Sequence, residues 1–516
     1  MTAHFSDRTP ILVGAGQCVV RELQAPEEVK SPVDLAAQAL RFALQDTGST
    51  QVAAAIDTLV ALRTFIDSAA ALEHPFGSSS KPPASIAQRL GLAPTLLIYG
   101  EEGGQSPQRF VNECAEAIYR GEQSVVAICG AEATAAMKTA LKHGWSLDWA
   151  EDPIGDMDDR GFQPLFTDVE RNHQITFPPQ VYAALENAWR YHHGLSVQEH
   201  QRLMADLFSP FSHVAADNPY AQFPVARSAN FLAITSDDNY ALNVPYGKWL
   251  VAQDAVNQGA AVVMTSVGRA RELGIRESQW VFLHGYADAS DRPVSEREDL
   301  TRSVAMNAAY HQALAMAELS VEKVDLFDIY SCFPVAVLAA CDVLDIDWRG
   351  STPLTVTGGL PYFGGPGNSY SLHAIAEMHG QLRAQPGLFG LVGANGGYLS
   401  KHAVGVYSTS PRGDWAPRTG NDAQREVDRS PQMVVQFPFD GEADIETYSV
   451  IFKRSEPVIG FAMCRDVETG HRVLSKVERG DTATLQKLLA REPIGRRVAV
   501  TTNERGAYLR FVDEAG

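Results

Sequence analysis

GGPGNSYSLHAIAEMHGQLRA, residues 364–384, is a glycine-rich turn that leads into a helix, and the chain holds a second pattern of the same kind. The counterpart is GGQSPQRFVNECAEAIYRG (103–121). Each helix is followed by an apolar run that contains Gly-Ala and then a polar residue: SVVAICGAEA (124–133) in the first case and LFGLVGANGG (388–397) in the second. The repeated order of turn, helix and strand predicts one α/β architecture that is used twice.

The segments around these patterns alternate between apolar strands and helices. TPILVGAGQ (9–17) and TLLIYG (95–100) are short apolar runs, typical of buried strands. SPVDLAAQALRFALQDTG (31–48) has Ser at a cap position, Pro in the first turn and Gly at the end, which are helix boundary signals. This alternation predicts the α/β class with a parallel sheet.

Three changes of composition suggest the domain boundaries. The α/β pattern fills a first half, 1–274, but is interrupted over about 138–245 by a polar and aromatic stretch, which predicts an inserted loop domain. It resumes in a second half, 275–412. A polar, Pro- and Gly-rich linker follows, and then apolar runs broken by turns such as ETGH, which predict a small β-rich, OB-like domain over 430–516.

Composition excludes several classes of function. The chain has 516 residues, with 43 Lys and Arg against 62 Asp and Glu, a formal net charge of −19. Such a charge argues against binding to nucleic acid or to an anionic membrane surface. The six cysteines show neither disulfide-scaffold density nor metal-ligand spacing, so we expect reduced thiols, no metal and a cytoplasmic protein. No signal peptide or membrane span is expected.

Three residues are candidates for catalysis. Cys332, in DIYSCFP, follows a buried strand and starts a helix, a position that lowers a thiol pKa. Tyr330 lies two residues before it, and His402 lies in the glycine-rich NGGYLSKHAVG. A Cys–His pair suits acyl transfer or carbon-acid chemistry. The alternative is that Cys332 is a core thiol and His402 bonds only to backbone. Neither a GxxxxGK[ST] motif nor a clean GxGxxG motif is present, so nucleotide binding of those kinds is not supported.

Four stretches of the chain resemble the thiolase superfamily. They are IYSCFPVAV (329–337), GANGGYLSKHAVGVYST (393–409), ILVGAGQ (11–17) and the stretch 364–384 quoted above. The resemblance is to the sterol-carrier-protein-thiolase branch and to the thiolase-like proteins of type 1, often named acetyl-CoA acetyltransferases. It covers about residues 8–410, and the tail is similar to the extra C-terminal domain of type 1 proteins. It implies a duplicated five-layered αβαβα fold, CoA or acyl-CoA as the ligand, no tightly bound cofactor, and a homodimer or monomer.

Position by position, this chain departs from the active site of true thiolases. Their nucleophilic cysteine falls near Gln105, where Ser106 is the only nearby hydroxyl. The HDCF motif of the sterol-carrier branch matches Tyr330 to Phe333, which keeps only Cys332 and Phe333. The histidine of GHP is replaced by Gly365, and the CxG motif falls near Ala394 to Gly397 without a cysteine. The resemblance therefore places the active-site and oxyanion loops at Gln105, Ser106, Gly365, Asn395 and Gly397.

Three functions follow from this pattern. The first is C–C bond cleavage or formation on a β-hydroxyacyl-CoA by retro-aldol chemistry without an acyl-enzyme, in which Tyr330, Cys332 and His402 serve as acid and base groups. The second is an acyltransferase that uses Cys332 as its nucleophile. The third is a non-catalytic acyl-CoA-binding or assembly protein.

Overall fold

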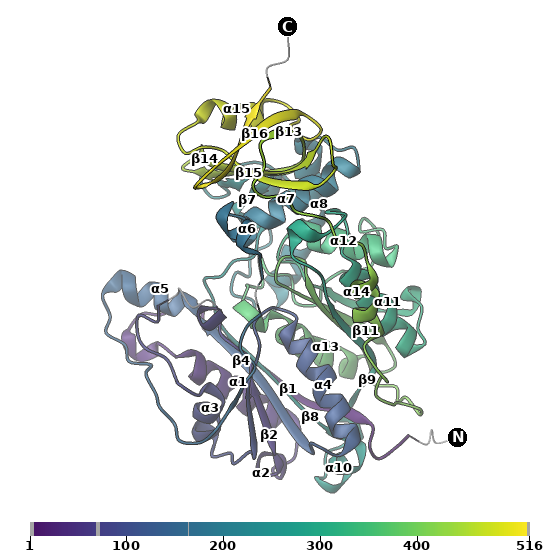
Figure 1. Cartoon of the computed structure of the whole chain (residues 1–516). Helices are drawn as coiled ribbons and strands as arrows, with labels where there is room; N and C mark the ends of the chain where they lie inside the picture. Colours follow the sequence, from purple (N-terminus) through teal and green to yellow (C-terminus); the bar gives the residue numbers. More distant parts are fainter. Residues whose placement is uncertain (1–4, 69–72, 164, 513–516) are drawn as a thin grey trace.

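Four strands of each α/β half follow the same order, which confirms the predicted duplication (Figure 1). The computed structural model describes residues 5–68, 73–163 and 165–512. In the first half the strands lie in the order β3-β2-β4-β8-β1, and in the second half in the order β10-β11-β12-β9. In the first half, β8 is antiparallel to both β1 and β4. In the second half, β12 is likewise antiparallel to both β9 and β11.

The strands of the first half are β1 (Pro10–Val19), β2 (Thr58–Ala61), β3 (Leu96–Tyr99), β4 (Val125–Ala133) and β8 (Asn257–Ser266). Those of the second half are β9 (Val281–Ser290), β10 (Leu326–Ile329), β11 (Phe389–Gly396) and β12 (Lys401–Ser408). Parallel pairs (β2 with β3 and β4, β10 with β11) and antiparallel pairs occur together, so the sheet is mixed rather than purely parallel. The two halves meet where β1 pairs with β9.

Helices form three layers around these two parts of the sheet. The middle layer is α4 (Ser106–Arg120) and α13 (Tyr370–Ala384), the two helices that follow the glycine-rich turns. One outer layer holds α1 (Pro32–Asp46) and α3 (Pro82–Leu90), and the other holds α11 (Val304–Ala317). The remaining helices of the two halves are α2 (Val52–Ala55), α5 (Thr134–His143), α10 (Val267–Glu272), α12 (Pro334–Leu344) and α14 (Asp422–Arg429). This is the five-layered αβαβα arrangement.

Local sequence explains how α1 is fixed on its sheet. Ser31 and Asp34 form a capping box at its start, with Asp34 N–H donating to the Ser31 hydroxyl. The strand β1 carries glycines where the helix crosses it: a Cβ at Gly14 would lie 2.3 Å from the Ala43 carbonyl oxygen. The glycines of VGAG therefore serve close helix packing and not a nucleotide phosphate.

The inserted segment and the C-terminal domain form one further unit (Figure 1). The insert holds β5 (Asp158–Asp159), α6 (Asp168–Asn172), α7 (Pro178–His192), α8 (Val197–Asp217), α9 (Ala229–Ala233), β6 (Ala241–Asn243) and β7 (Tyr246–Gly247). The C-terminal domain is a small five-stranded barrel of β13 (Gly441–Lys453), β14 (Glu456–Asp466), β15 (Arg472–Lys476), β16 (Arg497–Asn503) and β17 (Gly506–Phe511), with α15 (Thr482–Ala490). β6 pairs with β13, so strands of the insert extend the sheet of the barrel.

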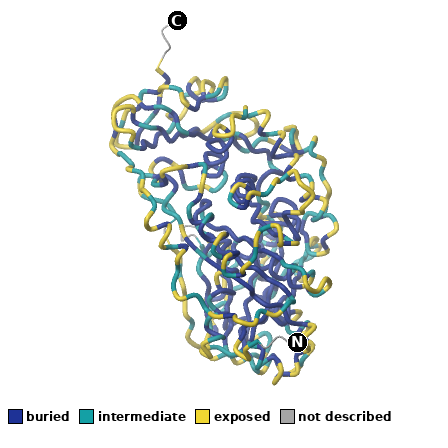
Figure 2. The backbone as a smooth tube through the Cα atoms, turned by 90° about the vertical axis from the view of Figure 1, so that its right-hand side faces the viewer, coloured by how far each residue is buried: buried dark blue, intermediate teal, exposed yellow. Residues whose placement is uncertain are grey.

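Burial follows the same division (Figure 2). Buried backbone runs through the α/β halves and through the barrel, which has its own apolar cluster around Val450, Val473 and Leu509. Among the described residues, no helix is long and apolar enough to cross a membrane.

Candidate active site

The two glycine-rich turns meet at the start of α4. The Gly103 N–H donates to Asn368 Oδ1 at 2.8 Å, and the Ser371 hydroxyl donates to the Gly104 carbonyl oxygen at 2.5 Å. Asn368 and Ser371 belong to the turn and helix of the second half. Each half therefore contributes one turn to a shared site between the two parts of the sheet.

The position expected for a nucleophile holds an amide. Gln105 is buried, and its Nε2 donates to the Glu102 carbonyl oxygen at 3.2 Å and to Glu101 Oε1 at 3.3 Å. The Ser106 hydroxyl is fully buried and makes no hydrogen bond within the part of the chain that the structure describes. Ser106 has no base beside it among these described residues, and the amide of Gln105 is not a nucleophile, so neither is an activated nucleophile.

Tyr330 reaches the same point from the other half. A Cβ at Gly104 would lie 2.2 Å from the Tyr330 hydroxyl oxygen and 2.5 Å from the Asn395 carbonyl oxygen. A Cβ at Gly396 would lie 1.8 Å from Gln105 Oε1. Gln105, Tyr330 and Asn395 are therefore brought together, and Tyr330 takes up the space beside the helix start.

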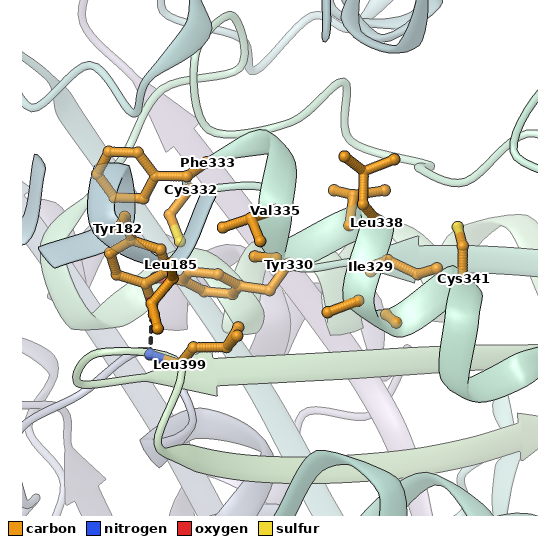
Figure 3. Close-up of a cluster of buried hydrophobic side chains, with 14 of the residues drawn as sticks. Tyr182, Leu185, Ile329, Tyr330, Cys332, Phe333, Val335, Leu338, Cys341 and Leu399 are labelled. Carbon is orange, nitrogen blue, oxygen red and sulfur yellow. Dashed lines mark hydrogen bonds between the residues drawn. The ribbon is translucent and has the colours of Figure 1, made fainter. Parts of the chain in front are cut away.

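Cys332 lies in the aromatic cluster next to Tyr330 (Figure 3). Asn395 Nδ2 lies 3.7 Å from the Cys332 sulfur and donates to the Tyr182 hydroxyl at 2.9 Å. The Tyr182 ring stacks on Phe333 with 4.2 Å between centroids. Tyr182 comes from α7 in the insert and was not predicted, because no motif in the sequence marks it.

The environment of the Cys332 thiol overrides its place before a helix. Burial raises its pKa to about 12, and hydrogen bonds from Tyr182 and Asn395 lower the pKa by less than burial raises it. The expectation of a low pKa from the helix start fails here, since an apolar, aromatic surrounding disfavours the thiolate more than the helix end favours it.

His402 lies on β12 directly opposite Asn395 on β11. Its ring is buried, and its Nε2 lies 3.1 Å from the Ser303 hydroxyl, which donates to Asp291 Oδ2 at 2.5 Å. The same hydroxyl accepts from the Met306 N–H and so caps α11. Burial lowers the pKa of His402 to about 4. Among the described residues, no hydrogen bond joins His402 to Cys332 or Tyr330.

The loop 358–370 owes its glycine content to backbone geometry. Gly358 has a φ of 109°, and a Cβ there would lie 2.4 Å from the Ala215 nitrogen of α8. Gly365 donates its N–H to the Gln253 carbonyl oxygen at 2.8 Å, and a side chain at 365 would meet the 252–253 segment. Gly397 has a φ of 61° in the turn between β11 and β12. Gly365 and Gly397 therefore shape the two loops that flank the cluster.

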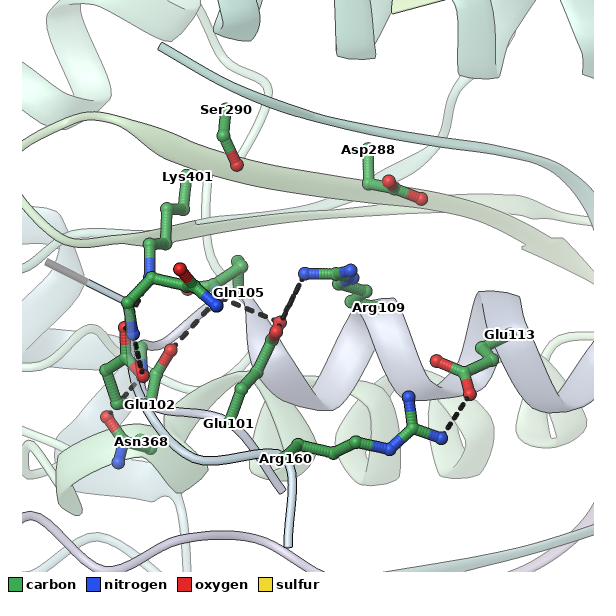
Figure 4. Close-up of polar contacts among 12 residues, drawn as sticks. Glu101, Glu102, Gln105, Arg109, Glu113, Arg160, Asp288, Ser290, Asn368 and Lys401 are labelled. Atoms are coloured by element: carbon green, nitrogen blue, oxygen red, sulfur yellow. Dashed lines mark hydrogen bonds and ion pairs between the residues drawn. The ribbon is translucent and has the colours of Figure 1, made fainter. Parts of the chain in front are cut away.

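Charged pairs lie beside the start of α4 (Figure 4). Glu102 is buried and pairs with Lys401, the first residue of β12, and it accepts from the Gln163 N–H at 3.0 Å. Glu101 pairs with Arg109 at 2.7 Å. Sequence reasoning missed Lys401, although it precedes His402 directly.

A patch of cations and aromatic rings lies on the insert. The Arg227 guanidinium lies 3.6 Å from the centre of the Trp249 ring, and Lys248 Nζ lies 4.9 Å from it. Burial lowers the pKa of Arg227, although the charge of Asp238 raises it in part. No ion pair of Arg227 or Lys248 with a carboxylate exists within the described ranges. The segment after Trp249 reaches the candidate site, because the Ala252 N–H donates to the Cys332 carbonyl oxygen at 2.9 Å.

Comparisons with known proteins agree with the fold and with the C-terminal domain. Residues 422–505 match the additional C-terminal domain of thiolase-like protein type 1. The crystal structure of a monomeric SCP2-thiolase-like protein type 1 from Mycobacterium smegmatis is 36% identical, with a TM-score of 0.84, over 98% of this chain and 100% of that chain.

More distant relatives share parts of the chain or the fold alone. An acetyl-CoA acetyltransferase from Methanothermobacter thermautotrophicus is 25% identical over 253 residues, 46% of this chain and 62% of the relative, so the match spans less than two thirds of that protein. The Ltp2–ChsH2(DUF35) aldolase has a TM-score of 0.54 at 17% identity, over 78% of this chain and 98% of that chain. The Mycobacterium structure is matched over its full length at 36% identity, and residues 422–505 match the additional domain, so the chain belongs to the SCP2-thiolase-like proteins of type 1 in the thiolase superfamily.

Proposed function

We propose that this protein binds an acyl-CoA thioester and does not form a covalent acyl-enzyme. The observation that carries the proposal is the state of the thiol. The position of the thiolase nucleophile holds Gln105, and the nearby Cys332 thiol is buried with a pKa of about 12. A thiol whose pKa lies so far above neutral pH is protonated, and the thiolate is the form that attacks a thioester.

The cation patch on the insert fits the anionic part of CoA. The Arg227 and Lys248 side chains pack against the Trp249 ring. They form a local cationic patch that suits phosphate groups, on a chain whose formal net charge is −19. Two neighbouring cations suit the phosphates of CoA. The segment 249–253 links this patch to the Cys332 loop, because the Ala252 N–H donates to the Cys332 carbonyl oxygen.

A calorimetric titration with CoA and acetyl-CoA tests the binding part. We expect the double variant Arg227→Ala/Lys248→Ala to weaken CoA binding at least about tenfold, since each lost contact to a phosphate is worth on the order of 1–3 kcal/mol. Arg276→Ala, at an exposed arginine between α10 and β9, is the matched control and leaves the affinity unchanged. Equal affinity of the double variant and the wild type would overturn the assignment of the patch.

Two measurements test the chemical part. Mass spectrometry after incubation with acetyl-CoA or acetoacetyl-CoA should show no acyl adduct, and an adduct on Cys332 would establish the acyltransferase alternative instead. A thiol reagent at pH 8 should react slowly with the native chain, because all six cysteines are buried. After denaturation all six should react.

A second candidate, a lyase of the retro-aldol type, is favoured by the place of Tyr330. Its hydroxyl lies beside the start of α4, where the helix N-terminus favours negative charge on an enolate oxygen. In this reaction a base takes the β-hydroxyl proton, the Cα–Cβ bond breaks, and an aldehyde or ketone leaves. The remaining enolate takes that proton back from the base at Cα, and Tyr330 hydrogen-bonds the thioester oxygen. For His402 to be the base, its Nδ1 must take the proton, because its Nε2 is bonded to the Ser303 hydroxyl. Chromatography of a β-hydroxyacyl-CoA incubation would detect the product, and Tyr330→Phe should abolish turnover while it leaves CoA affinity unchanged.

A further inference from the structure

A cavity of 70 Å³ lies at the carboxyl ends of β2 and β4, apart from the Cys332 cluster. Its walls come from α1, α3, α5 and the segments around 64–67 and 74–79, and none of Gln105, Tyr330, Cys332 or Asn395 lines it. The carboxyl ends of parallel strands are the usual place for ligands in open α/β sheets. The cavity has room for a ligand of a few non-hydrogen atoms.

The cavity has an acidic floor. Glu132, at the end of β4, is 2% exposed, and its Oε1 accepts from the Phe65 N–H at 2.6 Å. Its second oxygen makes no hydrogen bond with the residues that the structure describes. Since Glu132 lines the cavity, a ligand or water bound there can satisfy this oxygen.

The mouth of the cavity is also polar, while the walls between are apolar. Asp67 and His74 pair at 2.8 Å, with side chains 21% and 27% exposed, and Ser78 is exposed beside them. Apolar side chains such as Ile86, Met137 and Trp149 form the walls. Neither lysine nor arginine is among the lining residues within the described ranges, so the cavity disfavours an anion such as a carboxylate or phosphate.

We propose that this cavity binds a small organic cation, a primary alkylammonium whose apolar chain lies between the walls and whose ammonium group pairs with Glu132. The proposal stands apart from the acyl-CoA site, because it uses other residues and a ligand of opposite charge. An ammonium group has enough N–H donors for both oxygens of Glu132. It can donate to the oxygen without a protein partner and to the one that also accepts from the Phe65 N–H.

Binding of a cation at Glu132 is linked to proton release. Burial, opposed in part by the Phe65 N–H and aided by the charges of Asp67 and Asp254, raises the pKa of Glu132 to about 8. Asp67 is paired with His74, and Asp254 with Lys138 at 2.9 Å. At pH 6 the carboxyl group is protonated, and it must lose this proton to pair with an alkylammonium, which itself stays protonated. At pH values below the pKa of Glu132, the affinity for the cation should therefore rise about tenfold for each unit by which the pH increases.

Calorimetric titration of the full chain with n-butylamine at pH 6, 7 and 8 tests the proposal. We expect millimolar binding that tightens from pH 6 to 8, with release of close to one proton at the lower pH. Glu132→Gln should abolish binding. Asp254→Asn, which removes a nearby carboxylate outside the cavity, is the matched control and should retain it.

A second variant separates loss of binding from loss of folding. Ser78→Trp blocks the mouth at an exposed position and keeps Glu132, so it should lose n-butylamine binding at an unchanged melting temperature. n-Butanol should bind at least tenfold more weakly than n-butylamine, and butyrate should not bind. Absence of n-butylamine binding, equal binding of n-butanol, or affinity that falls from pH 6 to 8 would each overturn the proposal. The CoA titration is independent of all these outcomes.

Discussion

At the scale of single residues, the candidate active site is shaped by the side chain of Tyr330, which lies against Gly104. Gly104 allows the Tyr330 hydroxyl and the Asn395 carbonyl oxygen to approach the start of α4 to within 2.5 Å of the position of a Cβ. The phenol of Tyr330, from the second half, therefore fills the space beside Gly104 and Gln105.

Gly104→Ala tests this contact. The added methyl group must displace Tyr330 or the backbone at Asn395, and we expect a loss of about 1–3 kcal/mol in the free energy of unfolding. In a Tyr330→Ala background the same change should cost less by about 1 kcal/mol or more, because the ring is gone. Gly380→Ala is the control: nothing lies within 4 Å of its added Cβ, so it should stabilise α13 by about 0.5–1 kcal/mol. Urea denaturation measures all four chains, and equal costs in both backgrounds would contradict the contact.

The buried Glu132 should make the stability of the folded chain depend on pH, with or without a ligand in the cavity. Its pKa in the folded chain, about 8, lies above its ordinary value of 4.5, so the folded state holds a proton that the unfolded state releases between these values. The contribution of Glu132 to stability is thus full below pH 4.5 and is lost as pH rises toward 8, by at most about 1.4 kcal/mol per pH unit.

Comparison of Glu132→Gln with the wild type isolates this effect, because the other titrating groups are common to both. The variant should gain stability relative to the wild type from pH 5 to pH 8 in urea denaturation. A constant difference between the two proteins across this range would contradict the burial of an uncompensated carboxyl group.

At the scale of elements, local signals were enough to predict most of the two halves. The capped helix at 32–46, the helices after the two glycine turns and the apolar strands all form where the sequence places them. The linker prediction after residue 410 missed α14, whose exposed polar face resembles a loop in composition. Among the residues that the structure describes, the second half has no counterpart of β3, although PLTVT (353–357) is apolar.

The contacts of the site were harder to predict, since they join distant parts of the chain. Cys332, Tyr330, Gln105 and Asn395 converge as the resemblance implies, but Tyr182 lies 150 positions before Cys332 in a segment of no clear motif. The state of the thiol also escapes the sequence: it depends on burial by side chains from α7, and the helix start is the only one of these factors visible locally.

Arg472, on β15, anchors the barrel to the α/β halves, and its replacement should lower the stability of the protein. The Arg472 side chain is fully buried, pairs with Glu446 at 2.7 Å and donates to the Ser295 carbonyl oxygen at 2.9 Å. Arg472→Lys cannot keep these contacts together and should cost about 2–3 kcal/mol. Arg497→Lys, in an exposed pair with Asp444, is the matched control and should cost less than about 1 kcal/mol. Thermal unfolding compares them, and similar costs would show that the anchor contributes little.

At the scale of the whole molecule, the barrel and the insert are continuous with each other. β6 pairs with β13, and the Asn187 amide on α7 donates to the Tyr448 carbonyl oxygen at 3.1 Å. The insert also supplies Tyr182 to the candidate site. The barrel therefore supports the helix that covers Cys332, which gives the C-terminal domain a positioning role in addition to any role in binding.

The edge of the main sheet bears on the oligomeric state, and we propose a monomer. β3 would be an exposed edge strand, but the short strand β5 of the same chain pairs with it, and the Arg160 N–H donates to the Tyr99 carbonyl oxygen at 3.0 Å. β5 covers Ile98 and Tyr99, which shortens the ladder that this edge offers to a second copy. Light scattering should give 56.1 kDa, the mass of one chain.

Arg160→Pro removes that N–H and uncovers part of β3, so the measured mass should rise with protein concentration as edges pair. Arg160→Ala is the matched control: it loses the ion pairs with Glu113 and Asp158 but keeps the backbone donor, and it should stay monomeric. If the proline variant also stays monomeric at high concentration, β3 is not the latent interface. If the wild type has twice the mass of one chain, the copies join through a surface other than the part of β3 that pairs with β5.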